Sequence, residues 1–312
     1  SGAVVIVTSL SALFLLGTLD ETKAYKVEDK SNYTSDTFTE DGVNFTLQAH
    51  VGHINYKDKA DGKFKPTDKT LLYDNTKNGW YFNKDNFNPF YPQFSDDWVE
   101  FTDVYQDKNQ TIKYKAQANH IEGIKFSSLA GVTEGEGVQY PNAFGSGIDL
   151  LLYTTRSQLV KAVRINEAVA QSATTALTYK FELDLPVGKK VYRTEKDIKD
   201  KGAFLDKLEQ GNGKGGKKAY ELNLNQNKSL DSDKETLIGL QGEAGKEWFT
   251  YMRDFKVWDS GTGANLHSQN ITVNYTKEGG KYYIEKVVPL AFLQSAIGDV
   301  FTDTTTSYYA GA

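Results

Sequence analysis

Alternating apolar and polar residues recur along the chain from residue 43 onward. Val43, Phe45 and Leu47 fall on one side of an extended segment, and Ile54 and Tyr56 resume the alternation after Gly52. The clearest run covers residues 177–185, where one face holds Leu177, Tyr179, Phe181, Leu183 and Leu185. A period of two predicts half-buried β-strands.

Turn residues separate these runs at short intervals. Asp61-Gly62 and Gly279-Gly280 are hairpin signals, and residues 148–155 and 158–167 predict a strand pair that turns at Arg156-Ser157. Many short strands between turns predict an all-β fold of two packed antiparallel β-sandwich units with short helices only. The Gly-rich passage 127–147 marks their boundary, so we expect one unit at 25–130 and a second at 131–312.

Three segments depart from the alternation. Residues 194–209 carry apolar positions at loose helical spacing and predict the one longer helix, although Gly202 interrupts it. Residues 290–297, which follow Pro289, predict one or two helical turns. Residues 80–94, WYFNKDNFNPFYPQF, are aromatic and contain prolines, and they predict an irregular loop that packs over a sheet edge.

The start of the chain predicts export. Residues 3–17 form an apolar run that is shorter than a membrane span and resembles the apolar region of a secretory signal. We therefore interpret residues 1–24 as a truncated signal segment, which would be the only part of the chain to contact a membrane. A buried strand or helix of the mature fold is the alternative.

Composition excludes several classes of chemistry. The chain has no cysteine, which removes disulfides, thiolate catalysis and Cys-ligated metals. Its net charge is −5 with no long basic run, so we do not expect nucleic-acid binding. The single methionine is Met252, so residue 1 is not an initiator.

Candidate metal and catalytic residues form no recognised motif. His50 and His53 are three apart on a strand, where their side chains point to opposite faces and cannot share a metal. The acid-rich segments 58–62 and 231–235 weakly resemble calcium-binding sequences. Neither has the twelve-residue loop of a calcium-binding site that ends in a bidentate Glu, so we interpret both as hairpin turns. We expect no cofactor and no metal.

Loop acids leave a glycoside-active enzyme open as an alternative. Such an enzyme needs two carboxyl groups roughly 5–10 Å apart. The candidates lie in two groups: Glu134, Glu136 and Asp149, and Asp96, Asp97 and Glu100.

Aromatic residues supply the candidate ligand-binding surface. Exposed rings stack on sugars or anchor partners, whereas buried rings cap a sandwich core. The residues that we assign to ligand binding on this basis are Trp80, Tyr81, Phe90, Tyr91 and Trp98.

The turn at 141–149 is interpreted as structural. Pro141 and Asn142 set the turn, Gly145 and Gly147 supply backbone freedom, and Asp149 is expected to accept backbone N–H groups.

Three segments together resemble a known family. Residues 53–71, 140–165 and 282–309 resemble, in order and spacing, the N-terminal β-sandwich regions of large secreted bacterial cell-surface proteins, including those that precede wall-associated YD-repeat (Rhs-like) arrays. Asp303 lies in the closing strand of that pattern, where it would be structural. The resemblance implies export, a β fold, further domains beyond residue 312 and no catalytic residue.

The leading hypothesis is therefore an exported, extracellular or cell-surface structural and interaction module without catalysis. Its partners would be a cell-envelope glycan or surface protein and the C-terminal domains of the same longer protein. The alternatives are a carbohydrate-binding module that uses residues 80–94 and a glycoside-active enzyme.

Overall fold

The structure is a computed structural model, and it describes the chain in separate stretches. The described residues are 4–6, 25–26, 31, 35–39, 46–49, 54–104, 110–117, 128–155, 158–186, 190–193, 201–208, 217–222, 229–230, 236–240, 248–253, 256–262, 266–302 and 305–308.

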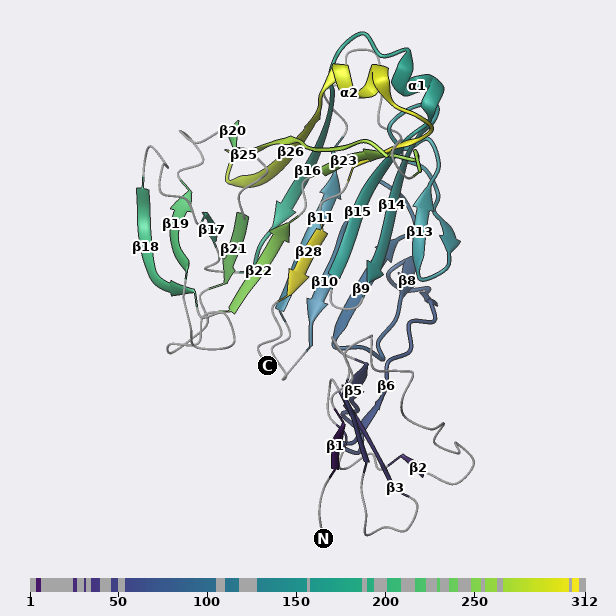
Figure 1. Cartoon of the computed structure of the whole chain (residues 1–312), viewed down its shortest axis with the longest axis vertical. Helices are drawn as coiled ribbons and strands as arrows, with labels where there is room; N and C mark the ends of the chain where they lie inside the picture. Colours follow the sequence, from purple (N-terminus) through teal and green to yellow (C-terminus); the bar gives the residue numbers. More distant parts are fainter. Residues whose placement is uncertain are drawn as a thin grey trace.

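The described chain is mostly β, as the alternation predicted, and most of it lies in two large antiparallel sheets (Figure 1). The first sheet has nine strands among the described residues. In spatial order they are β20 (Ser229–Leu230), β25 (Thr272–Glu278), β26 (Lys281–Val288), β16 (Leu177–Asp184), β11 (Gln110–Ala116), β10 (Val99–Asp103), β9 (Phe87–Pro92), β8 (Gly79–Tyr81) and β7 (Leu72–Asp74).

The second sheet is larger and branched. Its main path is β12 (Val132–Glu134), β13 (Gly137–Tyr140), β14 (Ile148–Thr155), β15 (Gln158–Ile165), β28 (Thr305–Tyr308), β22 (Trp248–Arg253), β21 (Thr236–Leu240), β17 (Lys190–Arg193), β19 (Lys217–Leu222) and β18 (Lys201–Leu208). The branch leaves β15 through β27 (Val300–Thr302), β23 (Lys256–Asp259) and β24 (Ser268–Asn270). The predicted hairpin β14–β15 is confirmed, with Thr155 opposite Gln158.

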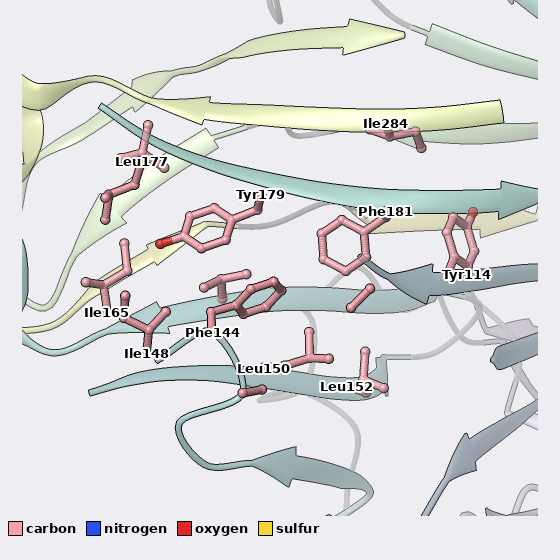
Figure 2. Packing of buried hydrophobic residues seen from close by; sticks show 14 of the residues in the cluster. Tyr114, Phe144, Ile148, Leu150, Leu152, Ile165, Leu177, Tyr179, Phe181 and Ile284 are labelled. Atoms are coloured by element: carbon pink, nitrogen blue, oxygen red, sulfur yellow. The ribbon is translucent and has the colours of Figure 1, made fainter. Parts of the chain in front are cut away.

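The two sheets enclose one hydrophobic core. On β16 the residues predicted to share a face, Leu177, Tyr179, Phe181 and Leu183, are all buried. Phe144, from the turn before β14, lies edge-on to the Tyr179 ring with the centroids 5.1 Å apart, and it also contacts the Phe181 ring (Figure 2). Alternation along the strand therefore did identify the inner face of the sheet.

The nine-stranded sheet crosses the predicted unit boundary near residue 130. β11, from the first predicted unit, pairs with β16, from the second, and Phe94 forms a β-bridge with Ala130. The Gly-rich passage at 127–147 contains the hairpin β12–β13 rather than a linker. Turn glycines mark hairpins inside a sheet as well as domain boundaries.

Two predictions of local structure are wrong. Residues 201–208, within the predicted helix, form strand β18 and pair with β19, which supplies the backbone hydrogen bonds that a helix would have made internally. Residues 80–94 contain the strands β8 and β9 instead of an irregular loop. The prolines misled the prediction, because Pro89 and Pro92 lie in a strand with a neighbour on each side.

The described part of the chain contains two short helices, which lie next to each other. α2 (Leu290–Ser295) was predicted, whereas α1 (Glu167–Gln171) was not. Asn166 is the N-cap of α1, where its side chain accepts the backbone N–H of Ala168. The side chain of Gln171 in turn donates to the backbone oxygen of Ala296 after α2.

A smaller sheet and a hairpin precede the sandwich, at the end of the molecule opposite the helices (Figure 1). The sheet has the order β1 (Val4–Ile6), β4 (Thr46–Ala49), β3 (Ser35–Thr39), β2 (Tyr25–Lys26), and the hairpin is β5 (Asn55–Lys57) with β6 (Phe64–Pro66). Strand β1 belongs to the predicted signal segment and pairs with β4. Residues 7–24 of that segment lie outside the described residues. Across the described part of the chain, no helix has the length and apolarity that a membrane span requires.

Candidate functional site

One edge of the sandwich is hollowed where the two sheets part. The hairpin β7–β8 ends the first sheet, the hairpin β12–β13 ends the second, and a hollow of about 750 Å³ lies between them. We call it the edge hollow, and its walls include Asp68, Lys69, Tyr73, Trp80, Thr133 and Glu136.

An aromatic pair forms one wall of the edge hollow. Tyr73 and Trp80 face each other across β7 and β8, with ring centroids 5.3 Å apart and an interplanar angle of 71°. Tyr73 is 40% exposed, and its hydroxyl donates to the Gln93 side chain at 3.1 Å. Trp80 is half-buried and packs on the margin of the core. The pair thus presents apolar ring surface beside polar groups, the combination that sugars and partner side chains use.

The position of the Trp80 ring is fixed by the opposite hairpin. A methyl group at Gly131 would lie 2.5 Å from Val138 and 3.2 Å from the Trp80 ring, so only glycine allows this approach. The Tyr140 hydroxyl donates to the backbone oxygen of Pro92, which ties the second sheet to the first beside the hollow. The aromatic wall is therefore held in place before any ligand arrives.

Charged groups line the remainder of the edge hollow. The Lys69 ammonium lies 3.6 Å from the Glu136 carboxylate and connects the segment before β7 to the β12–β13 turn. Hydrogen bonds from the Thr70 side chain and backbone N–H, followed by Lys84 at 3.1 Å, lower the pKa of Asp68 to about 2. Asp68 is therefore ionised at neutral pH, and the hollow offers both charged acceptors and a charged donor.

The structure separates the five residues that the sequence assigned to ligand binding. Trp80 lines the edge hollow, whereas Tyr91 is fully buried in the core and its ring does not reach the surface. Tyr81 and Phe90 are half-buried cross-strand partners on the face opposite to Trp80 and Tyr91. Trp98 is half-buried before β10. Assignment of Tyr91 to a ligand surface is thus corrected, because β9 alternates inward and outward and Tyr91 points inward.

Sequence reasoning missed Tyr73 as the partner of Trp80. The short strand β7 contains Leu72, Tyr73 and Asp74, and it shows no alternation long enough to recognise. The sequence signal that could have found it is the turn-forming run Asn-Thr-Lys-Asn at residues 75–78. In the structure this run is the turn between the two strands, and Asn78 lies in the left-handed region at φ 54°. A hairpin at that turn places Tyr73 opposite Trp80.

Most candidate acids are engaged by cations or backbone donors. The Glu100 carboxylate lies 3.0 Å from Lys113 and 3.2 Å from Lys77, and Asp96 accepts from the Ser128 hydroxyl. Glu136 pairs with Lys69, and Asp149 pairs with Arg164. An acid–base pair needs carboxyl groups that face each other across a cleft. These carboxylates instead face positive or hydroxyl partners.

The turn at 58–62 uses its carboxylates to hold a lysine. Lys65 lies 2.7 Å from Asp58 and 2.9 Å from Asp61, so both acids face an ammonium group in the β5–β6 hairpin. Within the described stretches, no group of three or more His, Cys, Asp or Glu side chains could hold a metal ion. His50, His53, His120 and residues 231–235 lie outside the described residues.

The turn residues assigned to structure have defined contacts. Asn142 adopts φ 59° and its side-chain oxygen accepts the N–H of Gly147, which itself has φ 75°. Pro141 precedes this turn and is half-buried, and Asp149 accepts the backbone N–H of Asn142, the type of contact that was expected. Asp303 lies outside the described residues.

A second buried acid was not recognised from the sequence. Asp259, at the end of β23, is fully buried and accepts the backbone N–H groups of Gly261, His267 and Ile297. Its carboxylate also lies 2.9 Å from Nδ1 of His267. Burial alone would raise the pKa of Asp259, but the backbone donors outweigh it and the net pKa is lowered. Asp259 joins the β23–β24 hairpin to the end of α2.

Comparison with known proteins gives no relative for this fold and site: no family model matches the chain, and no similar chain was found among the curated proteins or the solved structures.

Proposed function

We propose that this chain is a non-catalytic interaction module of an exported bacterial surface protein, and that it binds a glycan in the edge hollow. The observation that carries the proposal is the aromatic pair Tyr73–Trp80 in an open hollow with polar walls. Sugars have apolar C–H faces and polar hydroxyl edges, so they bind where rings and hydrogen-bonding groups converge.

Several features support a binding module over an enzyme. The carboxylates of Glu100, Glu136 and Asp149 are each paired with a cation, which keeps them from acting as a free acid–base pair. Asp68 is strongly acidic and pairs with Lys84. A general acid needs a pKa near the working pH, whereas the pKa of Asp68 in this hollow is far below it.

Export and surface display rest on the sequence. The apolar run at 3–17 and the resemblance to N-terminal sandwich regions of secreted bacterial proteins favour a position outside the cell. A module of this kind would hold further domains of a longer protein near the envelope while the edge hollow contacts a cell-envelope glycan.

A glycan array tests the proposal. The wild-type chain is compared with Trp80→Ala and Tyr73→Ala, and with Phe94→Ala as a matched control, since Phe94 is 41% exposed but does not line the hollow. We expect the two hollow variants to bind about fivefold to tenfold more weakly, because one aromatic contact contributes on the order of 1 kcal/mol.

Two results would overturn the proposal. Equal binding by wild type and Trp80→Ala would place the glycan elsewhere. Absence of binding to any glycan by a folded wild-type chain would leave the spacer role, in which the module only holds other domains.

A further inference from the structure

The charged residues that line the edge hollow are Asp68, Lys69 and Glu136. Asp68 is balanced by Lys84, which lies 3.1 Å away outside the lining of the hollow. Lys69 and Glu136 form the second pair, with the ammonium and carboxylate groups 3.6 Å apart. The charge that a ligand meets therefore depends on how completely Lys69 neutralises Glu136.

The single positive charge of Lys69 acts on two acids. Besides Glu136, it acts on Asp85, which is 4% exposed. Burial raises the pKa of Asp85 to about 6, and the charge of Lys69 opposes this rise whereas that of Glu136 adds to it. At pH 7 Asp85 is mostly ionised, so two carboxylates and one ammonium group carry a net charge of about −1.

The carboxylates are the charged groups of the lining that a ligand reaches most readily. The side chain of Glu136 is 58% exposed and that of Asp68 is 43% exposed, whereas that of Lys69 is only 15% exposed. A ligand in the edge hollow therefore meets negative charge first, and the partly shared Lys69 does not cancel it.

The turn that carries Glu136 is held in place against the sheet. Glu136 lies between β12 and β13, and Gly135 beside it adopts φ 57°. A methyl group at Gly137 would lie 2.4 Å from the backbone oxygen of Leu152, so β13 packs closely on β14 directly after the turn. The backbone that positions the Glu136 carboxylate at the hollow is thus fixed before a ligand arrives.

The aromatic wall favours a ligand of the same charge. The faces of tyrosine and tryptophan rings are negative and attract a cation within about 6 Å of the ring centroid. Tyr73 is 40% exposed and Trp80 is half-buried, and both rings line the hollow. A sugar acid would meet these ring faces together with two exposed carboxylates, so its own carboxylate would be repelled.

Building on the proposed function, we infer that the glycan bound in the edge hollow carries a free ammonium group, as an amino sugar without an N-acetyl group does. The ammonium group would lie near the Glu136 carboxylate while a C–H face of the sugar stacks on Tyr73 and Trp80. A neutral sugar would keep the stacking contact but would leave the charge of Glu136 without a partner on the ligand.

Three methyl glycosides that differ only in the group on carbon 2 test this inference: those of glucosamine, N-acetylglucosamine and glucose. Each is titrated at pH 7.0 and low salt into the ¹⁵N-labelled chain while the Trp80 indole N–H and the backbone amide of Glu136 are followed. We expect the glucosaminide to bind at least about fivefold more tightly than either neutral glycoside. This preference should shrink at high salt, because salt screens charges at exposed sites.

The variant Glu136→Gln removes the charge and keeps the size of the side chain. We expect its affinity for the glucosaminide to fall by about threefold or more, with its affinity for the glucoside and its Tm unchanged. The matched control is Glu134→Gln, because Glu134 is an exposed acid on β12 that does not line the hollow. This control should bind all three glycosides like wild type.

The outcomes separate this inference from the proposed function. If a neutral glycoside shifts the Trp80 signal and binds as tightly as the glucosaminide, the glycan site stands and the ammonium group is refuted. Glucosaminide binding that is equal in Glu136→Gln and wild type also refutes the inference. If the glucosaminide shifts neither signal up to about 50 mM, well above the millimolar range of weak specific binding, the inference fails, and the glycan array then decides the proposed function by itself.

Discussion

The carboxylate of Asp149 accepts the backbone N–H of Asn142 at 2.7 Å, and it thereby closes the turn that leads into β14. Its other oxygen accepts from the Gln139 side chain at 2.9 Å and from Arg164, the cross-strand neighbour on β15. One acid therefore fixes a left-handed turn, a neighbouring strand and the hairpin partner together. Asn142 needs this support because its φ of 59° is unusual for a residue other than glycine.

Replacement of Asp149 should lower stability through that turn. Asp149→Ala leaves the Asn142 N–H and the Arg164 guanidinium without their acceptor, and we expect a loss of about 2–3 kcal/mol in the free energy of unfolding. Asp149→Asn keeps an acceptor for the N–H and should lose about half as much. Urea unfolding of the three proteins measures this. Equal stability of Asp149→Ala and wild type would show that the contacts do not hold the turn.

Gly79 should tolerate no side chain. A methyl group there would lie 2.4 Å from the backbone oxygen of Tyr91 and 2.5 Å from the Phe90 ring, so Gly79→Ala forces β8 away from β9. We expect destabilisation of about 2 kcal/mol or more, as in overpacked cores. The matched control is Gly135→Asn, because Gly135 has φ 57° with no atom near its Cβ position and asparagine accepts that conformation. Thermal unfolding compares them, and a fully stable Gly79→Ala would contradict the pairing of β8 with β9.

Asp85 should make the protein more stable at mildly acidic pH. Burial raises the pKa of Asp85 to about 6, with Glu136 adding to the rise and the N–H of Asn86 and the charge of Lys69 opposing it. The folded state then holds the proton more tightly than the unfolded state, so this contribution to stability grows as pH falls from about 7 to about 4. A rise of about two pKa units corresponds to at most about 3 kcal/mol in the free energy of unfolding.

The variant Asp85→Asn isolates that contribution. Its amide oxygen still accepts the Asn86 N–H, but it does not titrate, so the difference in stability from wild type should change with pH between 7 and 5. Urea unfolding at several pH values gives the difference directly. A difference that is constant over this range would mean that Asp85 is not held in a raised-pKa environment.

Asp259 should show the opposite dependence on pH. Its pKa is lowered, since the backbone donors at Gly261, His267 and Ile297 outweigh its burial, and the stability that it contributes is present at neutral pH and lost as pH falls below about 4. Asp259→Ala should lose about 3 kcal/mol at pH 7 and much less at pH 3. Ser260→Ala, at the exposed neighbouring position, is the control with a small effect expected. A penalty that does not shrink in acid would contradict this account.

The sequence predicted the parts of the fold that depend on side-chain period and turn chemistry. Alternation identified the buried face of β16, and the Asn142–Gly147 turn before β14 follows from asparagine and glycine, the residues that most often adopt left-handed backbone. Such signals are local, so a single chain segment is enough to read them.

The remainder of the fold depends on contacts between distant segments. Strand β9 forms despite Pro89 and Pro92 because it buries Phe87 and Tyr91 between β8 and β10, and no local pattern shows those neighbours. Strand β18 forms where helical spacing was expected because β19 pairs with it. Tertiary pairing overrode local propensity in both segments.

The candidate site was predicted only in part. Trp80 could be chosen because an aromatic cluster is visible in the sequence, but Tyr91 in the same cluster points into the core. Tyr73 joins Trp80 within the β7–β8 hairpin, whereas Glu136 joins them only because the later β12–β13 hairpin lies beside the first. A site made at the edge where two sheets part is not encoded in any one stretch.

The four tryptophan indoles offer the most direct test of glycan binding in the edge hollow. The ¹⁵N-labelled chain is titrated with solubilised bacterial cell-wall glycan fragments while the four indole N–H signals are followed. We predict a saturable shift of the Trp80 signal, with those of Trp98, Trp248 and Trp258 unchanged. A titration in which the Trp80 signal stays fixed, whether or not another indole moves, would contradict the account.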